Sequence, residues 1–183
     1  MLNPYSPFPL AAALLSTLLA LGIGEQPPPT KTPDIHFVPT PQSIADAMLK
    51  LAAVTPADVV YDLGSGDGRI VILAAQKFGA RGVGIELDAR LVEISRQVAR
   101  EGKVADRVTF IQGDLFAADL SAATVVAIWL SNSVNMRLEA KLKRELPPGA
   151  RIVSHQFPIG MWAPDRKVHV EDKDLFLWTI PAP

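Results

Sequence analysis

The residues best suited to chemistry lie in the segment VVYDLGSGDGRI, residues 59–70. A short apolar run leads there into three glycines and then into a helical pattern. The glycines are Gly64, Gly66 and Gly68. Glycine permits a tight turn and lets the backbone approach a ligand closely. The flanking Asp62 and Asp67 disfavour a pyrophosphate and favour a ligand with a cationic group, although the turn alone is also compatible with a plain structural loop.

Two further carboxylates follow the next two expected strands. Glu86 ends the segment 82–85, where a carboxylate can accept hydrogen bonds from both hydroxyls of a ribose. Asp114 follows the segment 108–111, where it can accept a hydrogen bond from an adenine amino group. Each acidic residue alone is more often a helix cap or a turn former. Three of them at successive strand ends indicate a nucleoside-binding edge.

Helix and strand patterns alternate from residue 40 onward, and these elements must position the acidic residues. Thr40-Pro41 is typical of a helix start, with an oxygen cap before a proline, and predicts a helix over about 41–53. Strands are expected at 59–63, 82–85, 108–111, 123–130 and 151–154, helices at 68–78, from Asp88 to Gly102 and before Pro147, and a final hairpin at 166–170 and 175–180. This order predicts right-handed crossovers and a parallel sheet covered on both faces, with ligands at the carboxyl ends of the strands.

Apolar residues at helical spacing mark the expected inner faces of three helices. The expected faces are Ile44, Met48 and Leu51; Leu91, Ile94 and Val98; and Val134, Leu138 and Leu142.

The composition excludes several classes of protein. The chain of 183 residues has no cysteine, which rules out disulfides, cysteine metal sites and a thiol nucleophile. Its three histidines, at positions 36, 155 and 169, form no recognisable metal set, so no metal is expected. A formal net charge of -1 argues against a broad electrostatic grip on nucleic acid.

The first part of the chain differs from the rest. Residues 1–33 carry only two charged side chains, and nine of the 16 prolines fall within residues 1–41. The apolar stretch 8–23 would span about 24 Å as a helix, short of a hydrocarbon core of about 30 Å. We therefore expect residues 1–24 to be a membrane anchor or signal-like segment, 25–35 a proline-rich linker, and 36–183 the folded domain.

The motifs DLGSGDGR, GIELD and QGD resemble those of class I, seven-strand S-adenosylmethionine-dependent methyltransferases. This resemblance implies an α/β, Rossmann-like sheet of order 3-2-1-4-5-7-6 with strand 7 antiparallel and helices on both faces. The segments FVPTPQSIADAML, ATVVAIWLSNSVNMRLEAKLKREL and PGARIVSHQFPIGMWAPD are similar to the small archaeal protein-lysine methyltransferase. They also resemble the mitochondrial lysine methyltransferases that act on the c-subunit of ATP synthase and on the adenine nucleotide translocase, and the LSN region resembles Dot1-type enzymes.

The resemblance also assigns roles to individual residues. It implies cofactor binding by Asp62, Gly64, Ser65, Gly66, Asp67, Glu86, Asp114 and Thr40, and catalytic contacts from Asn132 and Thr40. Asn132 would orient the acceptor amine, and no general base is assigned, although His155 is a candidate for assisting proton loss. Phe37, Trp129 and Trp162 are candidates for an acceptor channel, but Trp129, expected inside a strand, is better explained by core packing.

The functional hypothesis is methyl transfer from S-adenosylmethionine to protein lysine, with membrane-associated proteins as possible targets and no nucleic acid. The alternatives are a small-molecule or lipid methyltransferase and a non-catalytic cofactor-binding module. Because the cofactor is made inside cells, we expect an anchor at residues 8–24 with the domain facing the cytoplasm. Lys31, on the C-terminal side of the segment, agrees with this orientation. Export through a cleaved signal peptide is the alternative.

Overall fold

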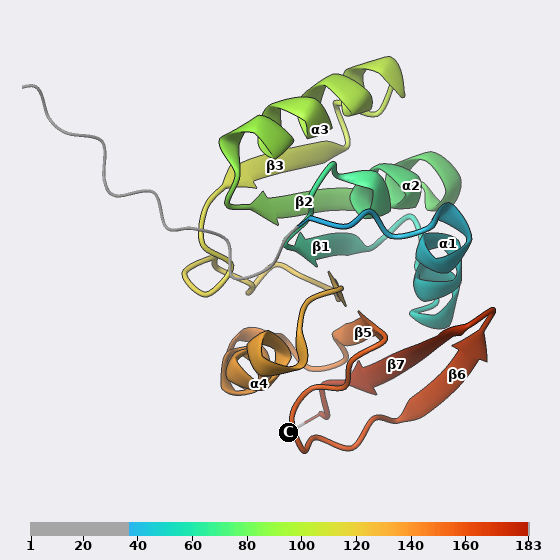
Figure 1. Ribbon diagram of the computed structural model, residues 1–183, viewed down its shortest axis with the longest axis vertical. Helices are drawn as coiled ribbons and strands as arrows, with labels where there is room; N and C mark the ends of the chain where they lie inside the picture. Colours follow the sequence, from blue (N-terminus) through green and yellow to red (C-terminus); the bar gives the residue numbers. More distant parts are fainter. Residues whose placement is uncertain (1–36, 183) are drawn as a thin grey trace, which may run out of the picture. The chain divides into compact units, whose positions relative to one another are not determined.

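The computed structural model describes residues 37–182, which form a seven-stranded sheet with four helices packed on it (Figure 1). The strands are β1 (Val59–Leu63), β2 (Arg81–Glu86), β3 (Val108–Gln112), β4 (Val125–Ile128), β5 (Arg151–His155), β6 (Arg166–Val170) and β7 (Lys173–Thr179). The helices are α1 (Gln42–Leu51), α2 (Arg69–Phe78), α3 (Ala89–Glu101) and α4 (Asn132–Glu145). The expected membrane segment 1–24 and linker 25–35 lie outside the described residues.

The strand order is β3-β2-β1-β4-β5-β7-β6, as the sequence resemblance implies. Strands β1 to β5 pair in parallel, and β7 runs antiparallel to both β5 and β6. The strands follow one another down Figure 1 from β3 to β6. Because the parallel strands all end at the same edge, the residues after β1, β2, β3, β4 and β5 meet there.

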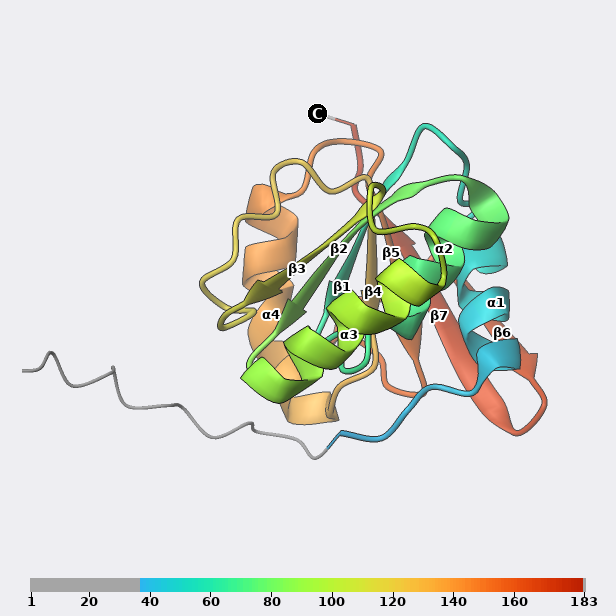
Figure 2. The same ribbon diagram turned by 90° about the horizontal axis from the view of Figure 1, so that it is seen from above.

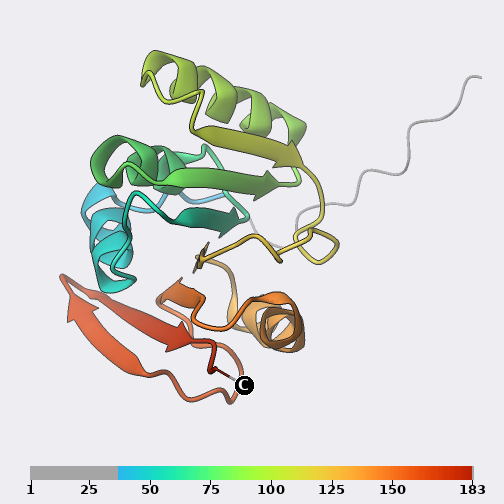
Figure 3. The ribbon, with the colours of Figure 1, turned by 180° about the vertical axis from the view of Figure 1, so that it is seen from behind.

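The helices divide between the two faces of the sheet (Figure 2, Figure 3). One buried cluster joins α1, α2 and α3 to the sheet, and a second joins α4 to the other face. Alternation along the strands explains the division, since Val125 and Ala127 point to the first cluster and Val126 and Ile128 to the second. The expected inner faces of α1 and α4 are buried as predicted.

The inner face of α3 differs from the prediction. Its buried residues are Val92, Ser95 and Ala99. Two residues of the expected inner face, Ile94 and Val98, instead face solvent and are 46% and 38% exposed. The shift by one position places a hydroxyl inside: Ser95 Oγ donates to the carbonyl of Gly66 at 3.0 Å, so α3 serves the glycine turn as well as the core.

Two predicted boundaries are also wrong. The strand expected at 123–130 extends only over Val125–Ile128, because its pairing with β5 ends at Ile128 and leaves Trp129 beyond the ladder. The N-cap of α1 is Pro41, which has no side-chain oxygen, and Thr40 lies buried one residue earlier. Trp129 and Thr40 therefore belong to connecting segments at the carboxyl edge of the sheet. The predicted ends at Asp88, Gly79 and Gly102 are confirmed as helix caps.

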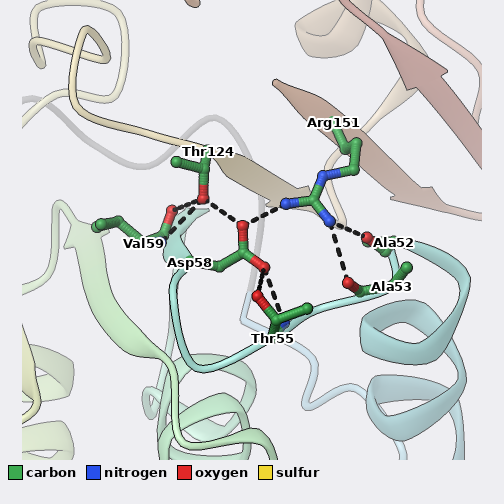
Figure 4. Close-up of polar contacts among 7 residues, drawn as sticks. All are labelled: Ala52, Ala53, Thr55, Asp58, Val59, Thr124 and Arg151. Carbon is green, nitrogen blue, oxygen red and sulfur yellow. Dashed lines mark hydrogen bonds and ion pairs between the residues drawn. The ribbon is translucent and has the colours of Figure 1, made fainter. Parts of the chain in front are cut away.

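The opposite, amino edge of the sheet is held by a hydrogen-bonded network around Asp58 (Figure 4). The Asp58 carboxylate accepts from Thr55 N–H at 2.7 Å, from both the Thr55 and Thr124 hydroxyls, and from the Arg151 guanidinium. Arg151 also donates to the carbonyl of Ala52 at 2.7 Å. The network ties α1, β1, β4 and β5 together where these elements begin or end.

Candidate active site

A small cavity, partly open to solvent, lies at the carboxyl ends of β1 and β4. It is lined by Phe37, Val38, Thr40, Asp62, Gly64, Ser65, Asp67, Arg69, Ile70 and Trp129. The lining comes from five places: the segment before α1, the end of β1, the glycine turn, the start of α2 and the residue after β4. The structure thus brings five of the predicted site residues into one cavity, Thr40, Asp62, Gly64, Ser65 and Asp67.

The glycine turn has no room for side chains. Gly64 and Gly66 have φ of +79° and +55°, in the left-handed region that favours glycine. A Cβ at Gly66 would lie 2.2 Å from Cε2 of Phe37, and one at Gly64 would lie 2.9 Å from Cδ2 of Leu130. The ring of Phe37 therefore packs directly on Gly66, while Gly64 is exposed and contributes main chain to the cavity wall.

Glu86, at the end of β2, supports the turn from behind. Its Oε2 accepts from Gly66 N–H at 2.9 Å, and its Oε1 accepts from the N–H groups of Leu87 and Asp88 at 2.8 and 2.9 Å. The carboxylate is buried, and Oε2, which accepts only one of these bonds, can accept a further hydrogen bond. Glu86 is thus joined to the turn, although it is not among the residues that line the cavity.

Asp62 is the most perturbed carboxyl group of the site. Its side chain is 3% exposed and lines the cavity from the end of β1. Burial, and then the negative charges of Glu86 and Asp67, raise the pKa of Asp62 to about 8. The apolar surroundings and the two neighbouring carboxylates make this position one where a cationic ligand group would be stabilised.

Asp67 is engaged by a residue that the sequence analysis did not single out. Its carboxylate holds the guanidinium of Arg69 through Nε at 2.9 Å and Nη2 at 2.5 Å. The same guanidinium donates from Nη1 to the carbonyl of Thr40 at 2.7 Å. Arg69 therefore clamps the segment before α1 onto the glycine turn. In the sequence, the available indication of this role was a basic residue directly after Gly68.

Two predicted residues lie apart from the cavity lining. Asp114 is half-buried in the turn after β3, where its Oδ1 accepts from Phe116 N–H at 3.0 Å. Asn132 is the first residue of α4 and is exposed. Both nevertheless lie at the carboxyl edge of the sheet, after β3 and β4 respectively. Their roles remain predictions.

The three candidate aromatic residues separate into two groups. Phe37 and Trp129 line the cavity. Trp162 instead packs on Trp178, with ring centroids 6.0 Å apart, and lies under the ammonium of Lys143 at 4.6 Å. The expectation that Trp129 is explained by core packing is wrong, because β4 ends before it and its indole forms part of the cavity wall.

Asn135 is a polar residue that sequence reasoning missed. It is fully buried on α4, and its Nδ2 donates to the carbonyls of Phe157 and Pro158 at 3.1 and 3.3 Å and to Ser154 Oγ at 3.3 Å. It therefore fixes the chain just after β5 at the edge that bears the cavity. The only indication in the sequence was that Asn135 falls on the buried side of the helical pattern, beside Val134 and Leu138.

Comparison with known proteins places this architecture in a family. A family model described as the ANTKMT methyltransferase domain matches residues 62–166. A protein-lysine N-methyltransferase of Saccharolobus islandicus is 43% identical over 145 residues, which cover 78% of this chain and 89% of that protein. The adenine nucleotide translocase lysine N-methyltransferase of Mus musculus is 42% identical over 118 residues, or 64% of this chain. The matched part is 51% of that mouse protein's length.

A solved structure extends the comparison to a bound molecule. The RNA methyltransferase from Salinibacter ruber, in complex with S-adenosyl-L-homocysteine, is 56% identical with a TM-score of 0.78. The match covers 80% of this chain and 95% of that chain. The named acceptors of the similar proteins thus differ, being protein lysine in two cases and RNA in the third.

Proposed function

Because the chain belongs to the ANTKMT methyltransferase domain family, we propose that it methylates the ε-amino groups of lysine side chains in other proteins. The enzyme is an S-adenosylmethionine-dependent methyltransferase. The single observation that carries the lysine acceptor is the 43% identity to a protein-lysine N-methyltransferase over 89% of that protein's length. Targets in other proteins, rather than small molecules, also agree with the name of the mouse relative.

The residues around the cavity fit the cofactor. The exposed main chain at Gly64, which lines the cavity and carries no side chain, suits close contact with an extended ligand. The buried hydroxyl of Ser65 has no hydrogen-bond partner among the described residues, so it is available to a ligand. Asp62 would hold a cationic group of the cofactor, and Glu86 would accept from its ribose through Oε2. Thr40 would contact it from the segment before α1.

The chemistry that S-adenosylmethionine supplies is a methyl group on a positively charged sulfur, which an amine displaces in line. The contribution of the protein is to position the two reactants and to set the charge around them. Arg69, bonded to Asp67 and to the carbonyl of Thr40, holds together two segments that line the cavity. Asn132 would orient the amine through its side-chain oxygen from the first turn of α4.

A lysine amine must be neutral to attack, and its ordinary pKa is about 10.4. A narrow, desolvated channel lowers that pKa because it disfavours the charged form. Phe37, Trp129 and Ile70 supply an apolar lining of this kind. No residue is assigned as a general base.

RNA is the second candidate acceptor, favoured by the name of the Salinibacter ruber structure. An RNA-binding surface requires basic side chains that are free to contact phosphates. Many of those on α3 and α4 are instead paired with acidic neighbours. These pairs are Arg96 and Arg100 with Glu93, Lys143 with Glu139, and Lys141 and Arg144 with Glu145. This pairing and the net charge of -1 favour a protein acceptor.

The membrane location is a separate proposal. None of the helices within residues 37–182 is long and apolar enough to cross a membrane. The proposal is that residues 8–24 anchor the enzyme and that the domain faces the cytoplasm, where the cofactor is made. Its support is the apolar, uncharged run of residues 10–23 followed by a proline-rich spacer. A C-terminal reporter that proved to be outside the cytoplasm would refute this placement.

The acceptor is tested by labelling. The protein is incubated with methyl-labelled S-adenosylmethionine together with an extract of cells that lack its gene. The label is then followed through separate digestion with ribonuclease and protease and through lipid extraction. We expect methyl-lysine in hydrolysed protein. Label released only by ribonuclease, or found only in lipid, would refute the proposal, and a complete absence of S-adenosylhomocysteine formation would favour a non-catalytic binding module.

A further inference from the structure

His155 ends β5 at the carboxyl edge, beside the cavity. It lies on the same face of the sheet as Trp129, which follows the neighbouring β4. The two rings stack, with centroids 4.3 Å apart and planes inclined by 35°. Since Trp129 lines the cavity, the imidazole lies directly behind one wall of the site.

The imidazole of His155 is fully buried, and neither Nδ1 nor Nε2 has a hydrogen-bond partner in the part of the chain that the structure describes. Burying unpaired polar groups costs stability, and a phenylalanine would stack on the indole without that cost. Packing alone therefore does not explain a histidine at this position. Its unpaired nitrogens are therefore available to a water or to a ligand group.

The charge state of His155 fits such a partner. Burial, with a smaller contribution from the ammonium of Lys173, lowers the pKa of His155 to about 4, while the carboxylate of Asp172 opposes the change. The ring is therefore neutral under physiological conditions. A neutral imidazole offers one nitrogen as a hydrogen-bond acceptor and adds no positive charge that would repel a cationic cofactor or an amine.

The backbone around His155 is held in an unusual conformation. Gln156, directly after it, has φ of +68°, and Phe157 N–H donates back to the carbonyl of His155 at 2.8 Å. A non-glycine residue in the left-handed region is strained and persists where the surroundings fix it. Asn135 supplies that support from α4 through its bonds to the carbonyls of Phe157 and Pro158.

We propose that Trp129 and His155 form the acceptor subsite, in which the indole borders the aliphatic stem of the target lysine and a ring nitrogen of His155, behind the indole, accepts a hydrogen bond from a water that also accepts one from the amine. This inference rests on the proposed function, since it presumes an amine acceptor. An indole face suits both the apolar stem and the cationic forms of a methylated amine. His155 acts as a positioning residue, because it sets where the amine and the indole lie.

Three variants and a matched control test the subsite. His155→Phe keeps the stacked ring but removes the nitrogens, His155→Gln restores an acceptor atom, and Trp129→Leu removes the indole. Trp162→Leu is the control, since that tryptophan packs on Trp178 away from the cavity. Lysine methylation is measured against increasing concentrations of the gene-deleted cell extract, the affinity for S-adenosylhomocysteine by calorimetry, and unfolding by heat.

We expect His155→Phe and Trp129→Leu to raise the apparent KM for the extract about tenfold. His155→Phe should also unfold at a higher temperature than the wild type, because it removes unpaired buried polar atoms. His155→Gln should recover part of the loss, while S-adenosylhomocysteine affinity in both His155 variants and KM in Trp162→Leu stay near wild-type values. A merely structural histidine would give lower stability and an unchanged KM.

The outcomes separate this inference from the proposed function. If the wild type labels lysine and His155→Phe does so with the same KM, the subsite is refuted and the lysine function stands. If the wild type labels no lysine, both proposals are refuted together.

Discussion

Two buried aspartates at opposite ends of β1 have opposite environments. Asp58, just before the strand, accepts hydrogen bonds from Thr55 and Thr124 and pairs with Arg151 (Figure 4). Burial alone would raise its pKa, but these hydrogen bonds and the charge of Arg151 hold the pKa below its ordinary value. Asp62, at the other end, is also buried, and burial together with the like charges of Glu86 and Asp67 raises its pKa to about 8.

The contrast indicates that the two edges of the sheet serve different purposes. At the amino edge the buried polar groups of the Asp58 network satisfy one another, which is the arrangement that stabilises a fold. At the carboxyl edge Asp62 is perturbed, and Ser65 and His155 contain buried atoms without partners among the described residues. Unpaired buried groups cost stability, and they collect where a ligand can pair them.

The largest expected effect is on stability at the amino edge. Asp58→Ala leaves the guanidinium of Arg151 without its partner and should lower the free energy of unfolding by about 3–5 kcal/mol. Denaturant unfolding measures this loss. Cofactor affinity in the protein that remains folded should stay near the wild-type value. A loss of less than about 1 kcal/mol would show that the network does not support the amino edge.

The next effect is on ligand binding at the carboxyl edge. Asp62→Asn should weaken S-adenosylmethionine binding about 10- to 100-fold, since it removes a charged acceptor from a buried site. Asp106→Asn, an exposed change in the turn before β3, is the control and should leave binding unchanged. Wild-type affinity in the Asp62 variant would contradict the assignment of Asp62 to the cofactor.

Asp62→Asn should also change how stability depends on pH. A pKa raised in the folded state gives stability that is fully present below the ordinary pKa of 3.8 and is lost as the pH rises through about 8. The variant does not lose stability in this way. The melting temperature of ligand-free Asp62→Asn, compared with that of the wild type, should therefore increase as the pH rises from 3.8 to about 8. Parallel melting curves for the two proteins at all pH values would mean that Asp62 ionises normally.

The smallest effects come from removing one hydroxyl at each edge. Thr124→Val deletes a hydroxyl that donates to Asp58 at 2.7 Å and should cost about 1 kcal/mol. Ser65→Ala deletes a buried hydroxyl that has no partner within residues 37–182 and should leave the stability of the ligand-free protein unchanged or raised. Equal losses in the two variants, measured by denaturant unfolding, would remove the distinction between the edges.

The sequence predicted the sheet and the glycine turn because both depend on local pattern. Asp62 and Glu86 were singled out because each lies near the end of an apolar strand, at an edge where parallel strands meet, and their role in cofactor binding stays a prediction. The clamp by Arg69 and the support from Asn135 were missed, since they join residues that are 29 and 22 positions apart and depend on tertiary packing. Trp129 was misjudged because apolar residues continue past the end of β4, and only the pairing with β5 shows where the strand stops.

The most direct test of the central claim, that the carboxyl edge is built for a cationic cofactor, is a proton count on binding. S-adenosylmethionine is titrated into the wild type near neutral pH in two buffers with different ionisation enthalpies. Because Asp62 is largely protonated without ligand and should ionise beside the cofactor, we predict proton release and a buffer-dependent enthalpy, both lost in Asp62→Asn. The same enthalpy in both buffers, with wild-type affinity in the variant, would contradict the claim.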